Sequence, residues 1–298
     1  MSSKPNVCIV GSINMDLTVK TDKMPQQGET VLGDTFFTNP GGKGANQAVA
    51  AARMGANVNF IGAVGDDSFG QTLRQNLISE GIGIDGVETI SDEATGTATI
   101  ILSENDNRII VASGANNRVT PELVMKHSDL IKNSDMVLLQ LEVPMETNVS
   151  TAEFAETNGV PVILNPAPFQ PLPENVLKST RYLTPNEIEL ASMKEDKLFK
   201  SIQRKLIVTR GDKGVSFVEN GTERNIGGHH VHVTDTTGAG DTFNGALAAE
   251  LAGDAKLSDA VTTANAAAAL SVTKIGAQIG MPTKQDVQNF LRERNMSE

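Results

Sequence analysis

The stretch VTDTTGAGDTFNGALAAEL, residues 233–251, decides the fold and the position of the site. It reads as a short β-like run, a loop of small residues and an apolar helix, so we expect a strand, a tight loop and a helix start. The small side chains of TTGAGD allow consecutive backbone N–H groups to turn inward, and the positive end of the following helix points at the same place. This pattern predicts that a phosphate group binds at the loop.

Asp241 is the unusual residue of this stretch, because a carboxylate beside a bound phosphate repels it unless the carboxylate has a separate task. One interpretation is an N-cap or first-turn acid, which the helix dipole favours. The other is a base that accepts the proton of an attacking hydroxyl. Phosphoryl transfer needs such a base besides positioning and charge neutralisation.

The residues DTTGAGDTFNGAL, 235–247, strongly resemble the C-terminal signature of the ribokinase, or PfkB, family of sugar and nucleoside kinases. The resemblance implies an ATP-dependent kinase in which Asp241 is the catalytic base, and this favours the second interpretation. It also implies that Gly238, Ala239 and Gly240 form an anion hole.

The stretch PGGKGANQAVAAARMG, residues 40–55, resembles the N-terminal signature of the same family. Its glycines permit close approach of a ligand to the backbone, and Lys43 and Asn46 supply donors near a helix start. The stretch lacks the G-x-x-x-x-G-K-[ST] spacing of a P-loop, so a Walker-type ATP site is not expected. The resemblance implies that Gly42, Lys43 and Asn46 bind the sugar.

Asn14 and Asp16 share one face of an extended segment, because polar and apolar residues alternate there. The pair is either a solvated strand face or a grip for vicinal hydroxyls, since an amide donates and accepts while a carboxylate accepts. The two residues match the sugar-binding N-x-D of the family, which implies the second reading. The family also has a substrate-contacting glutamate, which corresponds to Glu142 at the end of an expected strand.

Most of the chain alternates short apolar runs with helical patterns, which is typical of a parallel sheet flanked by helices. The run NVCIVG, residues 6–11, has the pattern of a buried parallel strand whose carboxyl end opens on a ligand crevice. By resemblance, we expect a single ribokinase-like α/β domain of three layers over residues 1–298. Its mostly parallel central sheet would carry helices on both faces.

A small β-sheet lid over the sugar is expected by resemblance, built from segments at about 14–38 and 96–112. Residues 105–107 read as the turn of a hairpin between two strand-like runs. Ala98, Ile100 and Ile110 are the expected apolar wall of the lid. The exposed edge of such a lid invites pairing with another copy, so we expect a homodimer through the lid strands.

Asn186 and Glu189 share a face of the first turn of an expected helix. The same spacing fits a capping box, which is the alternative interpretation. The pair resembles the N-x-x-E motif of the family, which implies a role in arranging Mg²⁺ and phosphate through water. A hard cation that keeps its waters suits one amide and one carboxylate.

For the nucleotide, the resemblance implies contacts from the loop TRGDKG, residues 209–214, and from a late helix. The expected contact residues are Thr209, Gly211, Gly214, Gly240 and Asn265. Between Glu189 and the strand that precedes this loop, the chain is shorter than the family's usual helical segment. The nucleotide side is therefore expected to be trimmed or loosened.

A monovalent-cation site beside the anion hole is also implied by the resemblance, with K⁺ as activator. Asp235 and Thr237 would face away from the phosphates, and a second irregular loop would complete an oxygen cage. The expected residues are Asp235, Thr237, Ser271, Lys274, Gly276 and Gly280. The alternative is ordinary loop hydrogen bonding, in which Asp235 caps its own turn.

Composition excludes several classes of function. A formal net charge of -11 disfavours a general binder of nucleic acid or anionic membranes, since both need a basic surface. The lone Cys8 and the absence of a signal-peptide pattern predict a cytoplasmic protein. Our interpretation is phosphorylation of ribose at its 5-hydroxyl; the alternatives are a kinase for another sugar or nucleoside and a non-catalytic sugar-binding homologue.

Overall fold

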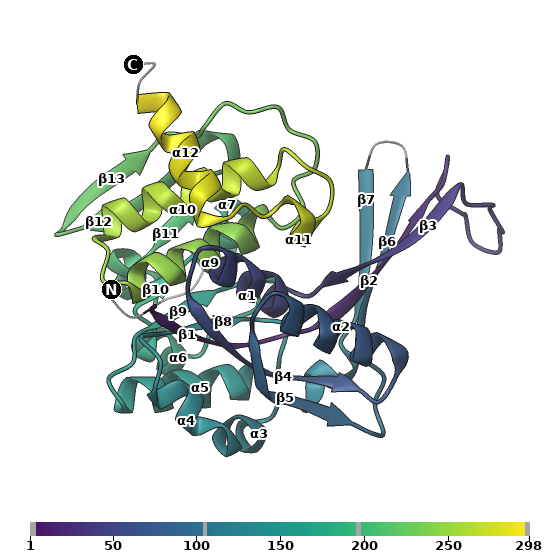
Figure 1. Cartoon of the computed structure of the whole chain (residues 1–298), viewed down its shortest axis with the longest axis horizontal. Coiled ribbons are helices and arrows are strands. Elements are labelled where there is room, and N and C mark those ends of the chain that lie inside the picture. The colour runs from purple at the N-terminus through teal and green to yellow at the C-terminus, as the bar shows by residue number, and fades with distance from the viewer. Residues whose placement is uncertain (1–3, 104–105, 195–197, 296–298) are drawn as a thin grey trace.

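The computed structural model describes residues 4–103, 106–194 and 198–295. Its centre is a six-stranded parallel sheet of order β10-β9-β8-β1-β4-β5. In that order the strands are Tyr182–Leu183, Val162–Asn165, Met136–Gln140, Asn6–Val10, Asn57–Gly65 and Gly83–Ile90. Helices cover both faces of the sheet (Figure 1), so the expected three-layer α/β fold is confirmed.

The two helical layers pack against alternate residues of the central strand β1. Val7 and Ile9 lie in one apolar core and Cys8 and Val10 in the other, all fully buried. Successive side chains of a strand point to opposite faces, so a strand between two helical layers is apolar at every position. The first layer contains α1 (Lys43–Arg53), α2 (Ser68–Ser79), α9 (Ala239–Ala252), α10 (Leu257–Ser271) and α12 (Lys284–Asn295). The second contains α3 (Pro121–Lys126), α4 (Ser128–Lys132), α5 (Met145–Thr157) and α6 (Glu174–Ser179).

A three-stranded antiparallel sheet continues the central sheet beyond β10. It consists of β11 (Ile207–Thr209), β12 (Val215–Glu219) and β13 (Thr222–Ile226). Two parallel bridges, Leu183 to Leu206 and Asn186 to Thr209, connect it to the β10 edge. The loop expected to bind the nucleotide therefore begins at the carboxyl end of β11, on the same side as the carboxyl ends of the central strands.

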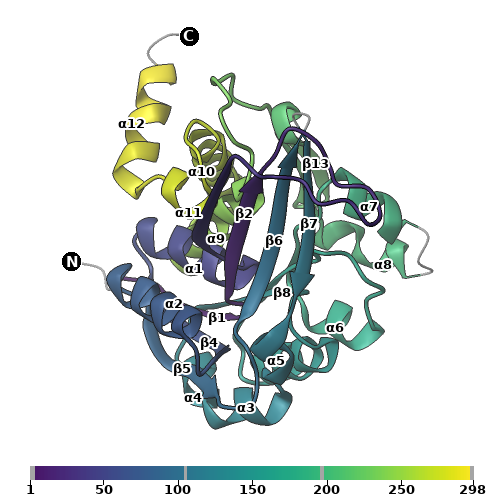
Figure 2. The same cartoon turned by 90° about the vertical axis from the view of Figure 1, so that its right-hand side faces the viewer.

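The lid is a four-stranded sheet of order β3-β2-β6-β7, and it projects from the body of the molecule (Figure 1) and is seen face-on in Figure 2. Its strands are β2 (Asn14–Lys20), β3 (Thr35–Gly41), β6 (Gly96–Ser103) and β7 (Asp106–Ala112). The antiparallel pairing of β6 with β7 confirms the hairpin, and residues 104–105 lie outside the described residues. β6 pairs with β2 in parallel, so the lid joins two segments that are distant in sequence.

One local expectation was wrong. Residues 227–238 form no strand, because Thr234 and Asp235 both donate their backbone N–H to the carbonyl of Val272 after α10 rather than to a ladder. Within the first lid segment, residues 28–34 are a turn followed by irregular chain, and β3 begins at Thr35. Residues 121–132 form two helices, α3 and α4, which meet at His127.

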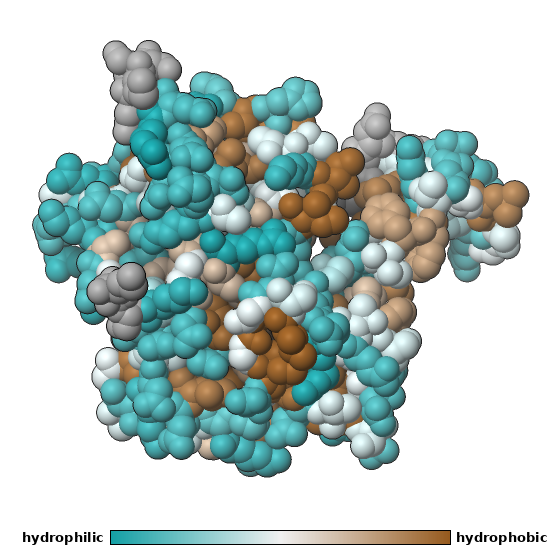
Figure 3. All heavy atoms as spheres, in the orientation of Figure 1, coloured by the Kyte–Doolittle hydropathy of each residue, from teal (hydrophilic) through white to brown (hydrophobic). Residues whose placement is uncertain are grey.

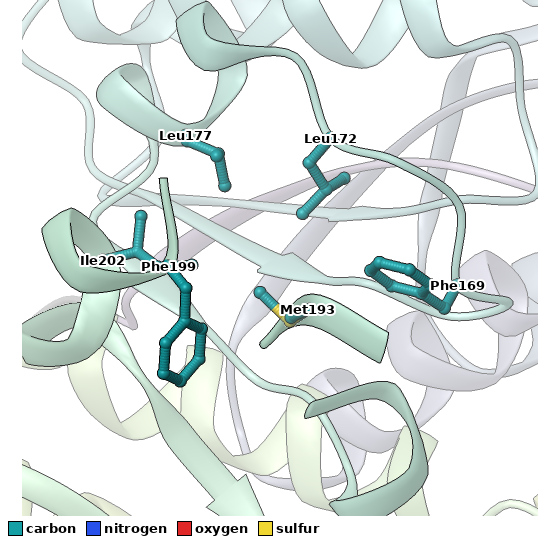
Figure 4. A pocket seen from close by; sticks show the side chains of 6 residues that line it. All are labelled: Phe169, Leu172, Leu177, Met193, Phe199 and Ile202. Atoms are coloured by element: carbon teal, nitrogen blue, oxygen red, sulfur yellow. The ribbon is translucent and has the colours of Figure 1, made fainter. Parts of the chain in front are cut away.

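The short segment after Glu189 is packed rather than loosened where it is described. Helices α7 (Glu187–Met193) and α8 (Phe199–Ile202) bury Met193 and Ile202 in the second core. Figure 4 shows their side chains grouped with those of the facing loop and helix, in a set formed by Phe169, Leu172, Leu177, Met193, Phe199 and Ile202. Residues 195–197 of this segment lie outside the described residues. Within the described ranges, no helix is long and apolar enough to cross a bilayer.

Candidate active site

The loop before α9 and the first turn of α9 lie where the sequence places the anion site. Gly238 is the N-cap, with φ of 78° and ψ of 2°, and a Cβ there would be 2.9 Å from the Cα of Ala277 on α11 (Ala277–Gly280). Only glycine adopts this left-handed conformation without strain, and only glycine fits this close approach. The loop ends at Gly240, which is exposed, while the next residue, Asp241, is buried.

Asp241 lies in the first turn of α9 but does not cap it. Its Oδ2 accepts from Asn46 Nδ2 at 3.0 Å and its Oδ1 accepts from Gln47 Nε2 at 3.1 Å. Both donors belong to α1, which packs against α9, where Gly245 allows close contact between the helices. The N-cap half of the alternative interpretation is therefore wrong, because the cap is Gly238 and the carboxylate is held by the side chains of a neighbouring helix. Asp241 is nevertheless an acid in the first turn of α9, as the other half of that interpretation expects.

The lid places Asn14 and Asp16 above this carboxylate. Asn14 Oδ1 accepts from Asn116 Nδ2 at 2.7 Å, and Asn116 Oδ1 accepts from the N–H of Ile13 at 2.9 Å. These bonds fix the amide of Asn14 so that its Nδ2 is directed away from Asn116 and remains available as a donor. Asp16 covers Gly41 on the adjacent strand, where a Cβ would overlap the carboxylate.

Glu142, two residues after β8, is fixed by the turn that connects β1 to the lid. Its Oε2 accepts from Ser12 Oγ at 2.5 Å and from the backbone N–H of Lys43 at 3.0 Å. The buried Ser12 also accepts from the N–H of Gly44 at 3.3 Å. The carboxylate of Glu142 therefore joins three segments: the turn after β1, the chain that follows β8 and the start of α1.

Lys43 stands among four carboxylates at this site. Burial lowers the pKa of its ammonium group, but the negative charges outweigh burial and hold the pKa above its ordinary value. Those charges belong to Asp241, Glu142, Glu189 and Asp16. Burial has the opposite effect on an acid and raises the pKa of Asp241. Lys43 and the amides of Asn46 and Gln47 act against burial and lower this pKa.

The fold also opposes the ionisation of Asp16. Burial, with smaller contributions from the charges of Glu142 and Asp241, raises its pKa to about 7, against the opposing effect of Lys43. The ordinary pKa is about 3.9, so the charge on Asp16 costs stability that increases as the pH rises from about 4 to 7.

Asp16→Asn is therefore expected to stabilise the protein at neutral pH. Each pKa unit corresponds to about 1.4 kcal/mol, so the gain at pH 8 is up to ~4 kcal/mol, or roughly 2–8 °C in Tm. The gain should disappear as the pH falls toward 4, where Asp16 is protonated in the folded and the unfolded protein. Thermal unfolding of both proteins between pH 4 and 8 measures it, and a constant difference in Tm across this range would contradict the assignment.

Asn186 and Glu189 form a complete capping box at the start of α7. Asn186 Oδ1 accepts from the N–H of Glu189, and Glu189 Oε2 accepts from the N–H of Asn186, each at 2.8 Å. The capping interpretation is thus confirmed, but it does not exclude a second task. Burial raises the pKa of Glu189, and Asp241 adds to this while Lys43 opposes it, so the carboxylate lies within the field of the site.

The nucleotide loop is a tight turn between β11 and β12. Gly211 and Gly214 have φ of 57° and 90°, and Arg210 donates its backbone N–H to the carbonyl of Gly214 at 2.8 Å. Asn265 of α10 is buried and donates Nδ2 to the carbonyl of Gly227 at 2.9 Å, which fixes the neighbouring chain after β13. Thr209 is half-buried at the end of β11 and donates its N–H to Pro185.

The residues expected to hold a monovalent cation are brought together. Asp235 Oδ1 accepts from the N–H of Thr237 at 2.9 Å and Oδ2 accepts from the N–H of Gly276 at 2.8 Å. Gly280 lies against the carbonyls of Ser271 and Lys274. The bond to Thr237 is the turn-capping contact of the alternative interpretation, and the bond to Gly276 joins the two loops.

The apolar wall of the lid requires one correction. Residues paired directly across strands share a face, and Asp16 pairs with Ala98, which pairs with Val111. Ile100 is on the same face, but Ile110 pairs with Thr99 and points to the opposite, outer face, where it is 67% exposed. The expectation for Ile110 was therefore wrong by one residue, and Val111 takes its place beside Ala98.

Three polar residues of the site were not identified from the sequence. Gln47 is part of the N-terminal signature but had no assigned role, although it holds Asp241. Ser12 and Asn116 hold Glu142 and Asn14, respectively. The NN pair that contains Asn116 lies outside both signatures, and no periodicity marks it, so only its burial in the fold reveals it.

Comparisons with known proteins agree with this geometry. A model of the pfkB family carbohydrate kinases matches residues 4–284. A ribokinase from Bacillus subtilis is 44% identical over 290 residues, which cover 96% of this chain and 99% of that protein. A deoxyribokinase from Salmonella typhi is 34% identical over 96% of this chain and 98% of its own length. The structure of Arabidopsis thaliana ribokinase complexed with ribose and ATP superimposes with a TM-score of 0.89 at 32% identity, covering 97% of this chain and 99% of that one.

Proposed function

We infer that this chain, which belongs to the pfkB family of carbohydrate kinases, transfers the terminal phosphoryl group of ATP to the 5-hydroxyl of ribose. The position of Asp241 is the observation that carries the inference. Its buried carboxylate lies at the base of an exposed small-residue loop at a helix N-terminus, below the polar face of the lid. An acceptor hydroxyl between the lid and α9 would meet the base and the phosphate donor together.

The site divides into groups that bind and groups that react. Asn14 and Asp16 on the lid, with Lys43, Asn46 and Glu142 on the body, would bind the sugar hydroxyls, and the Gly42 backbone admits the sugar closely. Ala98, Ile100 and Val111 would cover its apolar side. The nucleotide would lie along the loop of Thr209, Gly211 and Gly214, with Asn265 fixing the adjacent chain.

In the reaction, Asp241 accepts the proton of the sugar hydroxyl, and the oxygen of that hydroxyl forms a bond to the γ-phosphorus. The bond from the γ-phosphorus to the bridging oxygen breaks, and ADP leaves with that electron pair. The N–H groups of Gly238, Ala239 and Gly240 and the dipole of α9 would stabilise the charge on the transferring group, and for this the N–H of Ala239 would exchange its 3.3 Å bond to the carbonyl of Thr236. Figure 3 shows the surface hollowed between lid and body, and a lid that excludes water there would favour transfer to sugar over hydrolysis.

Asn186 and Glu189 fit Mg²⁺ bound through water. Each commits one oxygen to the capping box, which leaves the second carboxylate oxygen of Glu189 for a hydrated cation. Mg²⁺ would supply charge neutralisation on the phosphates. We also expect the protein to work in the cytoplasm, where ATP is abundant, and Cys8 is buried as a free thiol.

A coupled assay of ADP release across a panel of sugars and nucleosides tests the substrate. Ribose is expected to give the highest kcat/KM, above 2-deoxyribose, other pentoses, hexoses and nucleosides. Deoxyribose is the most informative competitor because a relative acts on it by name. A higher kcat/KM for any other acceptor would contradict ribose as the substrate and leave the kinase assignment in place.

Activation by K⁺ is the expected consequence of the joined loops around Asp235. Carboxylate and carbonyl oxygens are hard donors, and the contributing residues would be Asp235, Thr237, Ser271, Lys274, Gly276 and Gly280. A bound cation would fix the dipoles of the anion loop without touching the substrate. The test exchanges Na⁺ for K⁺ at equal ionic strength and constant Mg²⁺. The parent should have a higher kcat in K⁺, and Asp235→Ala should lose this difference; a parent without preference for K⁺ would eliminate the site.

A homodimer through the lids is expected from the outer face of the lid sheet. Phe36 and Ile110 on that face are 63% and 67% exposed, and Figure 3 shows hydrophobic residues on the lid at the right. A second copy would cover them and the strand edges. Light scattering at high micromolar concentration should give a dimer, and Ile110→Lys should give a monomer while the control Ile78→Lys on α2 does not. A monomeric parent would contradict this assembly.

A further inference from the structure

We propose that Gln47 is a positioning residue for the catalytic base: together with Gln140 it keeps Asp241 ionised and fixes the direction of its carboxylate. Gln47 and Gln140 are both fully buried, and neither belongs to the predicted sugar-binding set. Gln47 Nε2 donates to Asp241 Oδ1 at 3.1 Å, and Gln140 Nε2 donates to Gln47 Oε1 at 2.7 Å. The inference rests on the proposed role of Asp241 as base.

The carboxylate dictates the orientation of both amides. An ionised carboxylate only accepts, so Gln47 must present its NH₂ group to Asp241. Its Oε1 then faces Gln140, which must present its own NH₂ group. Gln47 Nε2 also donates to Asn165 Oδ1 at 3.2 Å, and Asn165 Nδ2 donates to the carbonyl of Thr184 at 3.0 Å.

The other oxygen of Asp241 is bound by an amide that the sugar can also reach. Asn46 Nδ2 donates to Asp241 Oδ2, and Asn46 Oδ1 accepts from Gln278 Nε2 at 3.0 Å. Asn46 lies in the predicted sugar set, so sugar binding can alter its bonds. Gln47 is fully buried, so its bond to Oδ1 is shielded from solvent.

The side chain of Gln140 fits only because the neighbouring residue 11 is a glycine. Gln140 Oε1 is buried with no hydrogen-bond partner among the described residues, and a Cβ on Gly11 would clash with it. A side chain that served only to fill this space would be better apolar, because an unpaired buried oxygen costs free energy. The Nε2 of the same amide is the group that donates to Gln47.

The charges around Asp241 explain why the base needs such a donor. Asp16, Glu142 and Glu189 are like charges that face the site from the lid, the end of β8 and α7, while Lys43 is the cation among them. Burial and Glu142 raise the pKa of Asp241, and the amides of Asn46 and Gln47 lower it with Lys43. A hydrogen bond to a charged group is stronger than one between neutral groups, so the loss of one donor changes this balance appreciably.

The experiment compares Gln47→Leu and Gln140→Leu with the control Thr147→Val. The control removes a buried hydrogen bond, from Thr147 Oγ1 to the carbonyl of Val119, that has no connection to the base. We measure kcat at saturating sugar and ATP from pH 5 to 9, sugar affinity by calorimetry without ATP, and Tm. The profile of kcat reports groups in the bound complex, so the titration of Asp16 in the free protein does not enter.

Gln47→Leu is expected to shift the acidic limb of the kcat profile to higher pH by about one unit or more. At a given pH on that limb, kcat should therefore be about tenfold lower. Sugar affinity should change by less than about threefold, since the lid contacts remain. Gln140→Leu should change the limb in the same direction by a smaller amount. Thr147→Val should lower Tm without moving the limb.

An unchanged limb in both Gln47→Leu and Gln140→Leu would overturn the proposal, as would a sugar affinity that falls as much as kcat. Gln140→Leu leaves the amide on the base in place, so it carries the test if Gln47→Leu fails to fold. Titration of ¹³C-labelled aspartate carboxyls by NMR is independent of turnover: the Asp241 signal should titrate at higher pH in both variants. A parent inactive on ribose would contradict the proposed function, whereas an active parent with an unmoved Asp241 signal in the variants would contradict only the role of Gln47.

Discussion

Asp241→Asn is expected to reduce kcat by about 10²–10⁴-fold or more while sugar binding remains nearly intact. The amide preserves the shape of the carboxylate but cannot accept the proton of the attacking hydroxyl. It also turns an NH₂ group toward the amide of Asn46 or of Gln47, which both donate at this position, so positioning is lost in addition. The measurement is kcat from a coupled assay, with sugar affinity by calorimetry.

The matched control is Asp259→Asn, an exposed acid in the first turn of the neighbouring helix α10. It removes the same helix-dipole interaction without touching the site, and should leave kcat unchanged. If Asp241→Asn retained more than half of the parent kcat, Asp241 would be only a first-turn acid. Circular dichroism of each variant confirms that any loss is not unfolding.

Asp16→Ala and Asn14→Ala should raise the KM for sugar far more than the KM for ATP. Each removes hydrogen bonds to hydroxyls in a closed, desolvated site, worth about 0.5–3 kcal/mol, or roughly twofold to 150-fold in KM. Asp16 is expected to have the larger effect because a charged acceptor makes the stronger bond. Steady-state kinetics with each substrate varied in turn measures both constants.

Asp34→Ala is the control for this series, because Asp34 is an exposed acid just before β3 that lies off the polar face of the lid. Its KM values should equal those of the parent. Equal increases in KM for sugar and for ATP in Asp16→Ala would indicate general damage to the lid and would remove the sugar-binding assignment.

Much of the fold follows from sequence where local pattern and tertiary environment agree. The run at β1 is apolar at every position because both faces of the central sheet are covered, and this is visible without a structure. The two signatures likewise place Asn46 and Asp241 in one site, since they begin the packed helices α1 and α9.

The errors arise where a segment's partner decides its structure. The alternating residues before the anion loop suit a strand, but their backbone donors meet the carbonyl of Val272 at the end of α10, so no ladder forms. The face occupied by Ile110 depends on the register of β6 against β7, and an odd offset reverses it. The sequence shows that residues 47 and 140 are glutamines but not which way their amide groups point. The carboxylate of Asp241 on α9 sets that orientation.

The central claim is that a sugar hydroxyl, and not water, receives the phosphoryl group on a site organised around Asp241. The most direct measurement mixes the protein with ATP, Mg²⁺ and ribose and follows the phosphorus-containing products by ³¹P NMR. The ribose is labelled with ¹³C, so that the carbon that carries the ester can be located. The account predicts one phosphomonoester, coupled to carbon 5, formed in equal amount with ADP and absent with Asp241→Asn. Release of ADP with inorganic phosphate and no sugar ester, or an equal rate with Asp241→Asn, would contradict it.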